Sequence, residues 1–141
     1  MNEYLAWKAR LEASVSNALY GEVYDAVADE IVAAVETEVY EKYEPKVYKR
    51  RGFLGGLADK ENIVPYVDGM SLEVVNEASC VTGEPLSGFV AEIVESGEGY
   101  TWDVDIDPRP FHSVAERNVV QSGEAERALA RGLQRQGYEV L

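Results

Sequence analysis

Carboxylates at alternate positions are the first feature of this chain that could perform chemistry. They follow a pattern typical of the start of a calcium-binding loop: Asp103-x-Asp105-x-Asp107. A calcium loop also requires Gly at its sixth position and Glu at its twelfth. The chain has Pro108 and Val114 at those places. The apolar residues between the carboxylates instead predict an extended segment with one apolar side. We therefore expect neither a metal ion nor a cofactor.

The other residues with catalytic potential lack partners in the sequence. A general base needs an orienting group and a nucleophile within reach. His112 is the single histidine, and its neighbour Ser113 lies where a helix N-cap is expected. Cys80 is the single cysteine, has no nearby His or acid, and is interpreted as a small, partly buried side chain. The glycines at 52, 55 and 56 lack the Gly-Lys-Ser/Thr of a phosphate loop. We expect no enzyme activity.

The charge excludes broad nucleic-acid binding. With 141 residues and a net charge of −13, the chain is long enough for one domain, 1–141, and is strongly acidic. No apolar run approaches the length of a membrane span, and the N-terminus does not look like a secretory signal. We expect a soluble protein, made in the cytoplasm, with no membrane partner and no sequence-specific nucleic acid.

The one concentrated basic run defines a candidate protein interface. Lys and Arg give residues 46–51 a charge of +4, whereas residues 52–108 carry −11. Tyrosines, which are enriched at protein interfaces, flank this run. The candidate interface residues, called the basic elbow below, are Tyr40, Tyr43, Lys46, Tyr48, Lys49, Arg50 and Arg51.

The elements that would position these residues begin with a helical N-terminal part, 1–43. Apolar residues spaced by three or four positions predict helices over 3–19 and 22–43, with Asn2 as the cap and Gly21 as a kink or a separation. A helix of this length in so small a domain is expected to outreach the core and expose part of its apolar stripe.

A loop and hairpin region, 44–111, and C-terminal helices, 112–141, complete the predicted α+β fold. Strands are expected over 63–67 and 70–76, joined by Asp68-Gly69, and residues 89–94 carry a helical apolar stripe. Ser113 to Glu116 fits a capping box for a helix to about Gln121. A last helix is expected from Glu124 to Gln136, with Gly137 as its C-cap.

Several short motifs occur in a characteristic order along residues 20–137. They are Tyr-Glu-Pro-x-x-Tyr-x-x-Arg at 43–51, Gly-Gly-Leu with a following isoleucine at 55–63, Val-Ala-x-x-Val-Glu-x-Gly at 90–97, and Arg-Pro-Phe at 109–111. In this order the chain resembles the neck or tail-completion proteins that join heads to tails in long-tailed bacteriophages.

The resemblance implies a structural virion protein without enzyme activity. It would form a homo-oligomeric ring, expected to be a hexamer, at the neck or the top of the tail, and DNA would pass through it. Its partners would be further copies of itself, an adjacent head–tail connector or stopper protein, and tail terminator or tube proteins. An acidic channel wall agrees with this role, since negative charge repels phosphate. A head–tail adaptor or a tail terminator is a neighbouring possibility.

Two other functions compete with the virion role. The −11 charge of residues 52–108 would suit an acidic protein-binding module, such as a DNA mimic that occupies a nucleic-acid-binding partner. The acids are, however, distributed over several predicted elements rather than collected on one face. A small hydrolase has only His112 and scattered acids to support it.

Overall fold

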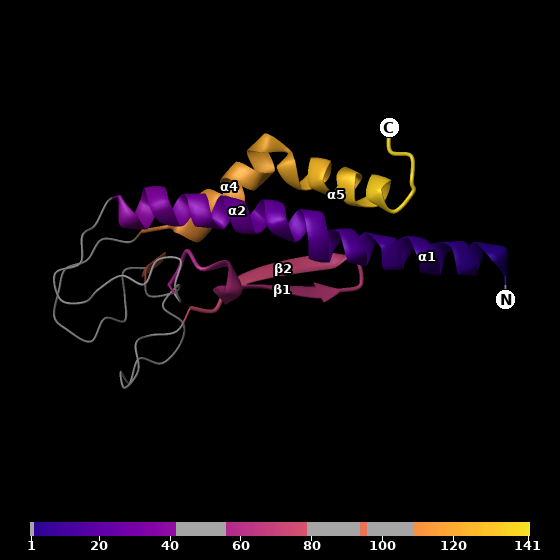
Figure 1. Ribbon diagram of the computed structural model, residues 1–141, viewed down its shortest axis with the longest axis horizontal. Helices are drawn as coiled ribbons and strands as arrows, with labels where there is room; N and C mark the ends of the chain where they lie inside the picture. The colour runs from indigo at the N-terminus through magenta and orange to yellow at the C-terminus, as the bar shows by residue number, and fades with distance from the viewer. Residues whose placement is uncertain (1, 42–55, 79–93, 96–108) are drawn as a thin grey trace.

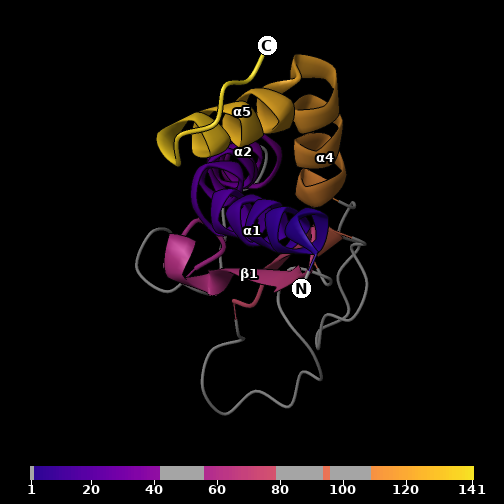
Figure 2. The same ribbon diagram turned by 90° about the vertical axis from the view of Figure 1, so that its right-hand side faces the viewer.

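The computed structural model describes residues 2–41, 56–78, 94–95 and 109–141. Its fold is α+β, as predicted, and has three layers (Figures 1 and 2). One long helix forms the middle layer. A two-stranded hairpin covers one side of it, and two C-terminal helices cover the other side.

The middle layer is a single helical run from Glu3 to Tyr40 rather than two separated helices. It consists of α1 (Glu3–Ala18), the π-helical turn η1 (Leu19–Val23), α2 (Tyr24–Val35) and a second π-helical turn, η2 (Glu36–Tyr40). Gly21, predicted to kink or interrupt the helix, lies inside η1. Asn2 caps the start as expected, because its side chain accepts a hydrogen bond from the Tyr4 amide at 2.8 Å.

The two π-helical turns have a reason in the sequence. The buried apolar side chains recur every four residues, at Leu19, Val23, Ile31, Val35 and Val39, with the partly buried Val27 in the same series. An α-helix has 3.6 residues per turn, so a four-residue repeat would rotate steadily away from the core. The wider π turns reduce that rotation and keep the stripe pointing inward.

The hairpin consists of β1 (Ile63–Asp68) and β2 (Ser71–Asn76), preceded by the short 3₁₀ helix η3 (Lys60–Asn62). The strands pair antiparallel with Asp68 opposite Ser71, so the turn residues are Gly69 and Met70, one position later than predicted. Gly69 has φ +60°, a value that glycine adopts readily at the first turn position. Asn76 is buried at the end of the inward face, where it donates to the Leu57 carbonyl.

The C-terminal layer contains α4 (Phe111–Ser122) and α5 (Glu124–Arg135), separated by Gly123 at φ +68°. The predicted C-cap at Gly137 is confirmed: its φ is +98°, and the Tyr138 amide donates back to the Leu133 carbonyl. Gly132 lets α5 approach the long helix, since a Cβ at this position would lie 2.5 Å from the Cβ of Ala18.

The core lies between α2, α4 and the hairpin. Its largest fully buried side chains are Phe111, Ile63, Val35 and Asn76. Phe111, the last residue of the Arg-Pro-Phe motif and the first residue of α4, is therefore a buried anchor of the core. Leu57 and Ala58 are also buried, so the residues that precede the hairpin contribute to the core.

Candidate protein interface

The N-terminal part of α1 extends beyond both the hairpin and α5 (Figure 1). We call residues 2–13 the α1 overhang; all of them are exposed except Ala6 and Leu11, which are half-buried. A straight helix from Glu3 to Tyr40 is about 57 Å long, at about 1.5 Å per residue. A compact chain of this size is only roughly 35–40 Å across. The prediction that the long helix outreaches the core is confirmed.

The overhang continues the apolar stripe that packs elsewhere against the core. Tyr4, Trp7 and Leu11 precede Val15 at helical spacing, and Val15 contacts the cluster around Leu19 and Ala128. Tyr4 and Trp7 are 60% and 49% exposed, and their ring centroids lie 6.2 Å apart. Single exposed apolar residues need no explanation, but an exposed aromatic pair on the core-facing stripe is a candidate contact surface.

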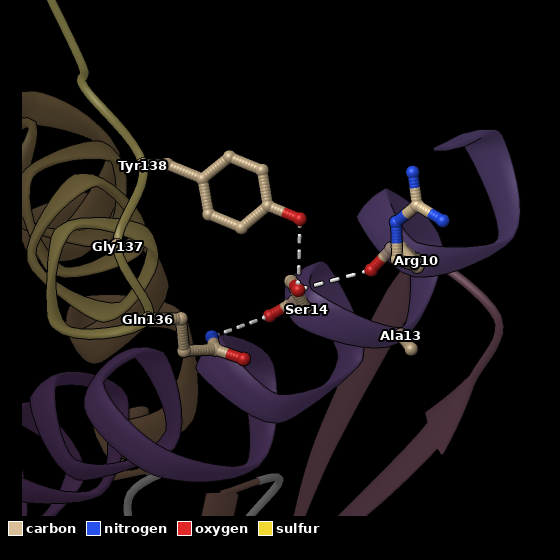
Figure 3. A pocket seen from close by; sticks show the side chains of 6 residues that line it. All are labelled: Arg10, Ala13, Ser14, Gln136, Gly137 and Tyr138. Carbon is tan, nitrogen blue, oxygen red and sulfur yellow. Dashed lines mark hydrogen bonds between the residues drawn. The ribbon is translucent and has the colours of Figure 1, made fainter. Parts of the chain in front are cut away.

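A shallow hollow lies where the overhang meets the C-terminal loop after α5 (Figure 3). Its lining residues are Arg10, Ala13, Ser14, Gln136, Gly137 and Tyr138. The Ser14 hydroxyl donates to the Arg10 carbonyl at 2.9 Å and lies 3.1 Å from the Tyr138 hydroxyl, and the Gln136 amide donates to the Ser14 carbonyl. These bonds hold the C-terminal loop against α1 and fix the base of the overhang.

Charges differ between the overhang and the rest of the long helix. The overhang is neutral as a segment, with Glu3 and Glu12 balanced by Lys8 and Arg10, and Lys8 pairs with Glu12 at 3.8 Å. Within the part of the chain that the structure describes, Arg10 has no ion pair closer than 4 Å and is exposed.

From η1 onward the helix is acidic. Its acids are Glu22, Asp25, Asp29, Glu30, Glu36, Glu38 and Glu41. Asp29 binds Lys60 at 2.7 Å, and this hydrogen bond raises the pKa of Lys60. Glu22 binds Arg135, whose hydrogen bond lowers the pKa of the Glu22 carboxyl. Asp25 is exposed at the surface of α2.

The structure describes only Tyr40 of the predicted basic elbow. Tyr40 ends η2 and packs, half-buried, against the core. Tyr43, Lys46, Tyr48, Lys49, Arg50 and Arg51 lie outside the described residues, and so do Cys80, the helical stripe at 89–93 and the carboxylates at 103–107. The elbow interface therefore remains a prediction.

The predicted capping box at Ser113 is wrong. The helix begins at Phe111, and its cap residue, Pro110, has no side chain that could accept a hydrogen bond. The Glu95 carboxylate takes that place: it accepts bonds from the His112 amide at 2.9 Å and from the Ser113 hydroxyl at 2.6 Å. A carboxylate suits the positive end of a helix dipole, so a distant acid replaces the local serine.

Among the residues that the structure describes, no acid–base pair forms around His112. The Ser113 hydroxyl is bonded to Glu95, and the His112 ring packs edge-on against Phe111 with centroids 4.6 Å apart. Burial lowers the pKa of the ring, an effect that the Glu95 carboxylate partly offsets. Among the described residues, no three His, Cys, Asp or Glu side chains gather into a possible metal site. No helix described here is long and apolar enough to cross a membrane.

Tyr4 and Trp7 lie on the apolar stripe whose spacing predicts the first helix, but that spacing alone does not mark them as an interface. The start of the stripe could have indicated an interface, because it lies well before the first helical position that a small core could cover. The contact between Ser14 and Tyr138 spans 124 positions of the chain and leaves no local pattern.

One comparison with known proteins gave a match. The model of the YomN family matches residues 4–135, which is most of the chain, and the chain therefore belongs to that family. The family takes its name from a gene in a Bacillus phage region, which indicates a phage-associated protein. No curated protein and no solved structure matches the chain.

Proposed function

We propose that this YomN-family chain is a structural protein of a tailed phage particle, in which it forms a ring, expected to be a hexamer, at the head–tail junction. In this role DNA passes through the ring, and the chain performs neck or tail-completion assembly without catalysing a reaction. It would be made in the host cytoplasm and reside at the neck or tail top. Its neighbours would be further copies, a connector or stopper protein, and tail terminator or tube proteins.

The observation that carries the proposal is the α1 overhang. A helix that continues its core-facing stripe past its own domain leaves Tyr4 60% and Trp7 49% exposed. Burying a large apolar side chain contributes about 1.5–3 kcal/mol, so this surface gains most when another protein covers it. A subunit of an assembly has such a surface by necessity, whereas a small enzyme does not need one.

The charge supports the same role. With a net charge of −13, the surface of the chain repels the phosphates of passing DNA. Assembly through an apolar stripe in a neutral segment avoids bringing the acidic surfaces of neighbouring subunits together. Family membership adds the phage association but names no place in the particle.

Inactivation of the gene in the encoding phage tests the proposal. We expect lysates with filled heads and separate tails in electron micrographs, and joined particles when the intact gene is supplied in trans. Mass spectrometry of purified wild-type particles should detect peptides of this chain. Normally joined particles from the inactivated phage, together with absence of the chain from purified virions, would refute the proposal and favour the acidic binding module.

A further inference from the structure

The exposed side of the long helix beyond the overhang has a composition that complements the overhang. Tyr20 is 53% exposed, and Asp25, Asp29 and Ala33 follow it on the surface. The step of five residues from Tyr20 to Asp25 crosses the π turn η1, and the later steps are four residues, so these side chains share one side. We call these four residues the acidic face.

The side chains of the two surfaces complement each other in charge and in size. The overhang has an aromatic ridge, Tyr4 and Trp7, and its cations Lys8 and Arg10 lie on either side of the stripe. The acidic face offers an exposed ring at Tyr20, the carboxylate of Asp25 and a small side chain at Ala33 where another helix can approach, while its second carboxylate, Asp29, binds Lys60. Opposite charges beside an apolar contact determine the register of such a pair.

We propose that the α1 overhang of one copy packs on the acidic face of the next copy, head to tail. This inference rests on the proposed function and specifies the contact that builds the ring. The overhang and the acidic face lie at different positions along the same helix, so the contact is heterologous. Such a contact closes into a ring when the rotation between neighbouring copies permits. Each added copy leaves one overhang and one acidic face available until closure.

Head-to-tail packing on the acidic face suits the overhang better than symmetric packing of two overhangs against each other. In a symmetric pair, Lys8 and Arg10 would meet the Glu3 and Glu12 of the partner, and the carboxylate of Asp25 would remain uncompensated. Asp29 already binds Lys60, so head-to-tail packing brings the exposed cation of Arg10 to Asp25, which has no ion pair within 4 Å among the described residues. Copies with a net charge of −13 repel each other, so the arrangement that places a cation against an acid is favoured.

The test uses the purified full chain and sedimentation velocity over a range of concentrations at physiological salt. Replacing Tyr4 and Trp7 by Ser should raise the dissociation constant of the oligomer at least about tenfold, as expected for central aromatic contacts. Leu5→Ser is the matched control, because Leu5 is 51% exposed on the same overhang but off the stripe. It should change the constant by no more than about twofold.

Exchanging the charges of Arg10 and Asp25 tests whether the overhang binds the acidic face. Arg10→Glu and Asp25→Arg should each weaken the oligomer, and the double variant should recover most of the lost affinity, since every copy then supplies both exchanged partners. The head-to-tail contact would be overturned if neither single variant weakened the oligomer or if the double variant did not recover affinity. A dimer whose affinity does not change with Asp25→Arg would also overturn it.

The phage complementation assay separates this inference from the proposed function. A wild-type chain that stays monomeric at the highest soluble concentration, yet restores head–tail joining, would overturn the inference and leave the function in place. If heads and tails joined normally without the gene, the proposed function itself would be refuted.

Discussion

Gly132→Ala tests how closely α5 must approach the long helix. A Cβ at residue 132 would lie 2.5 Å from the Cβ of Ala18, 2.6 Å from Oε2 of Glu22 and 3.1 Å from Cα of Ala18. Carbon atoms pack best at about 3.5–4.0 Å, so the first contact is too short by about 1 Å or more. The Glu22 side chain can turn away, but Ala18 belongs to a helix that would have to shift as a whole.

Two opposing effects determine the sign of the change. Alanine is favoured over glycine in a helix interior by about 1 kcal/mol. Overpacking of a well-packed contact costs about 1–3 kcal/mol. Movement of α5 would also loosen Ala128, which is fully buried against Leu19 and Val23. We expect the overpacking to dominate and Gly132→Ala to lower the free energy of unfolding by up to about 2 kcal/mol.

Gly21→Ala is the matched control on the facing helix. Its nearest neighbour would be the guanidinium of Arg135 at 3.8 Å, an ordinary contact, so only the gain in helix propensity remains. Chemical denaturation followed by circular dichroism, at one protein concentration, should show Gly21→Ala more stable than wild type by about 0.5–1 kcal/mol and Gly132→Ala less stable. A Gly132→Ala variant as stable as wild type would refute the close-packing argument.

Four further predictions concern other parts of the chain. Phe111→Ala should lower the free energy of unfolding by about 3–5 kcal/mol in denaturant melts, because the ring is fully buried; a loss below about 1 kcal/mol would show that it is not a core anchor. Glu95→Ala should cost about 0.5–2 kcal/mol by uncapping α4, whereas a cost of zero would mean that water or another acid replaces the carboxylate. Burial lowers the pKa of folded His112, so the unfolded chain takes up a proton first, and stability should fall as the pH drops below about 6.5. His112→Gln should flatten that part of the pH profile, and an unchanged slope would assign it to other groups. Reversing Arg50 and Arg51 to Glu should leave the subunit folded and weaken assembly most at low salt; normal assembly across ionic strengths would contradict the elbow interface.

The sequence predicted the elements whose signals are local. The four-residue spacing of apolar residues indicated the long helix, Asp68-Gly69 located the hairpin to within one position, and Gly137 marked the end of α5. Each of these depends on residues within one or two turns of the chain, where backbone preference and periodicity decide the outcome. The turn moved by one position because Gly69 adopts the positive φ at its first place.

Features that depend on distant contacts were not predictable. Ser113 had every local property of a cap, yet Glu95 reaches the α4 amides from 17 positions earlier in the chain. Local propensity could not anticipate it, because the position of Glu95 is fixed by the buried Val94 beside it and by the bond from the Arg109 amide to the Val94 carbonyl. The hydrogen bond between the hydroxyls of Ser14 and Tyr138 likewise depends on tertiary packing and not on local sequence.

The same stripe explains both the fold and the surface it leaves uncovered. From Val15 to Val39 its side chains are covered by α4, α5 and the hairpin, and the π turns keep them directed inward over that whole length. Tyr4 and Trp7 continue the stripe where none of those elements extends. Shortening the helix by its first three turns would remove the overhang without touching the buried clusters, so the stability of the subunit does not account for these residues. Their apolar character is accounted for when a second protein, in our proposal another copy of this chain, provides the cover that the fold lacks.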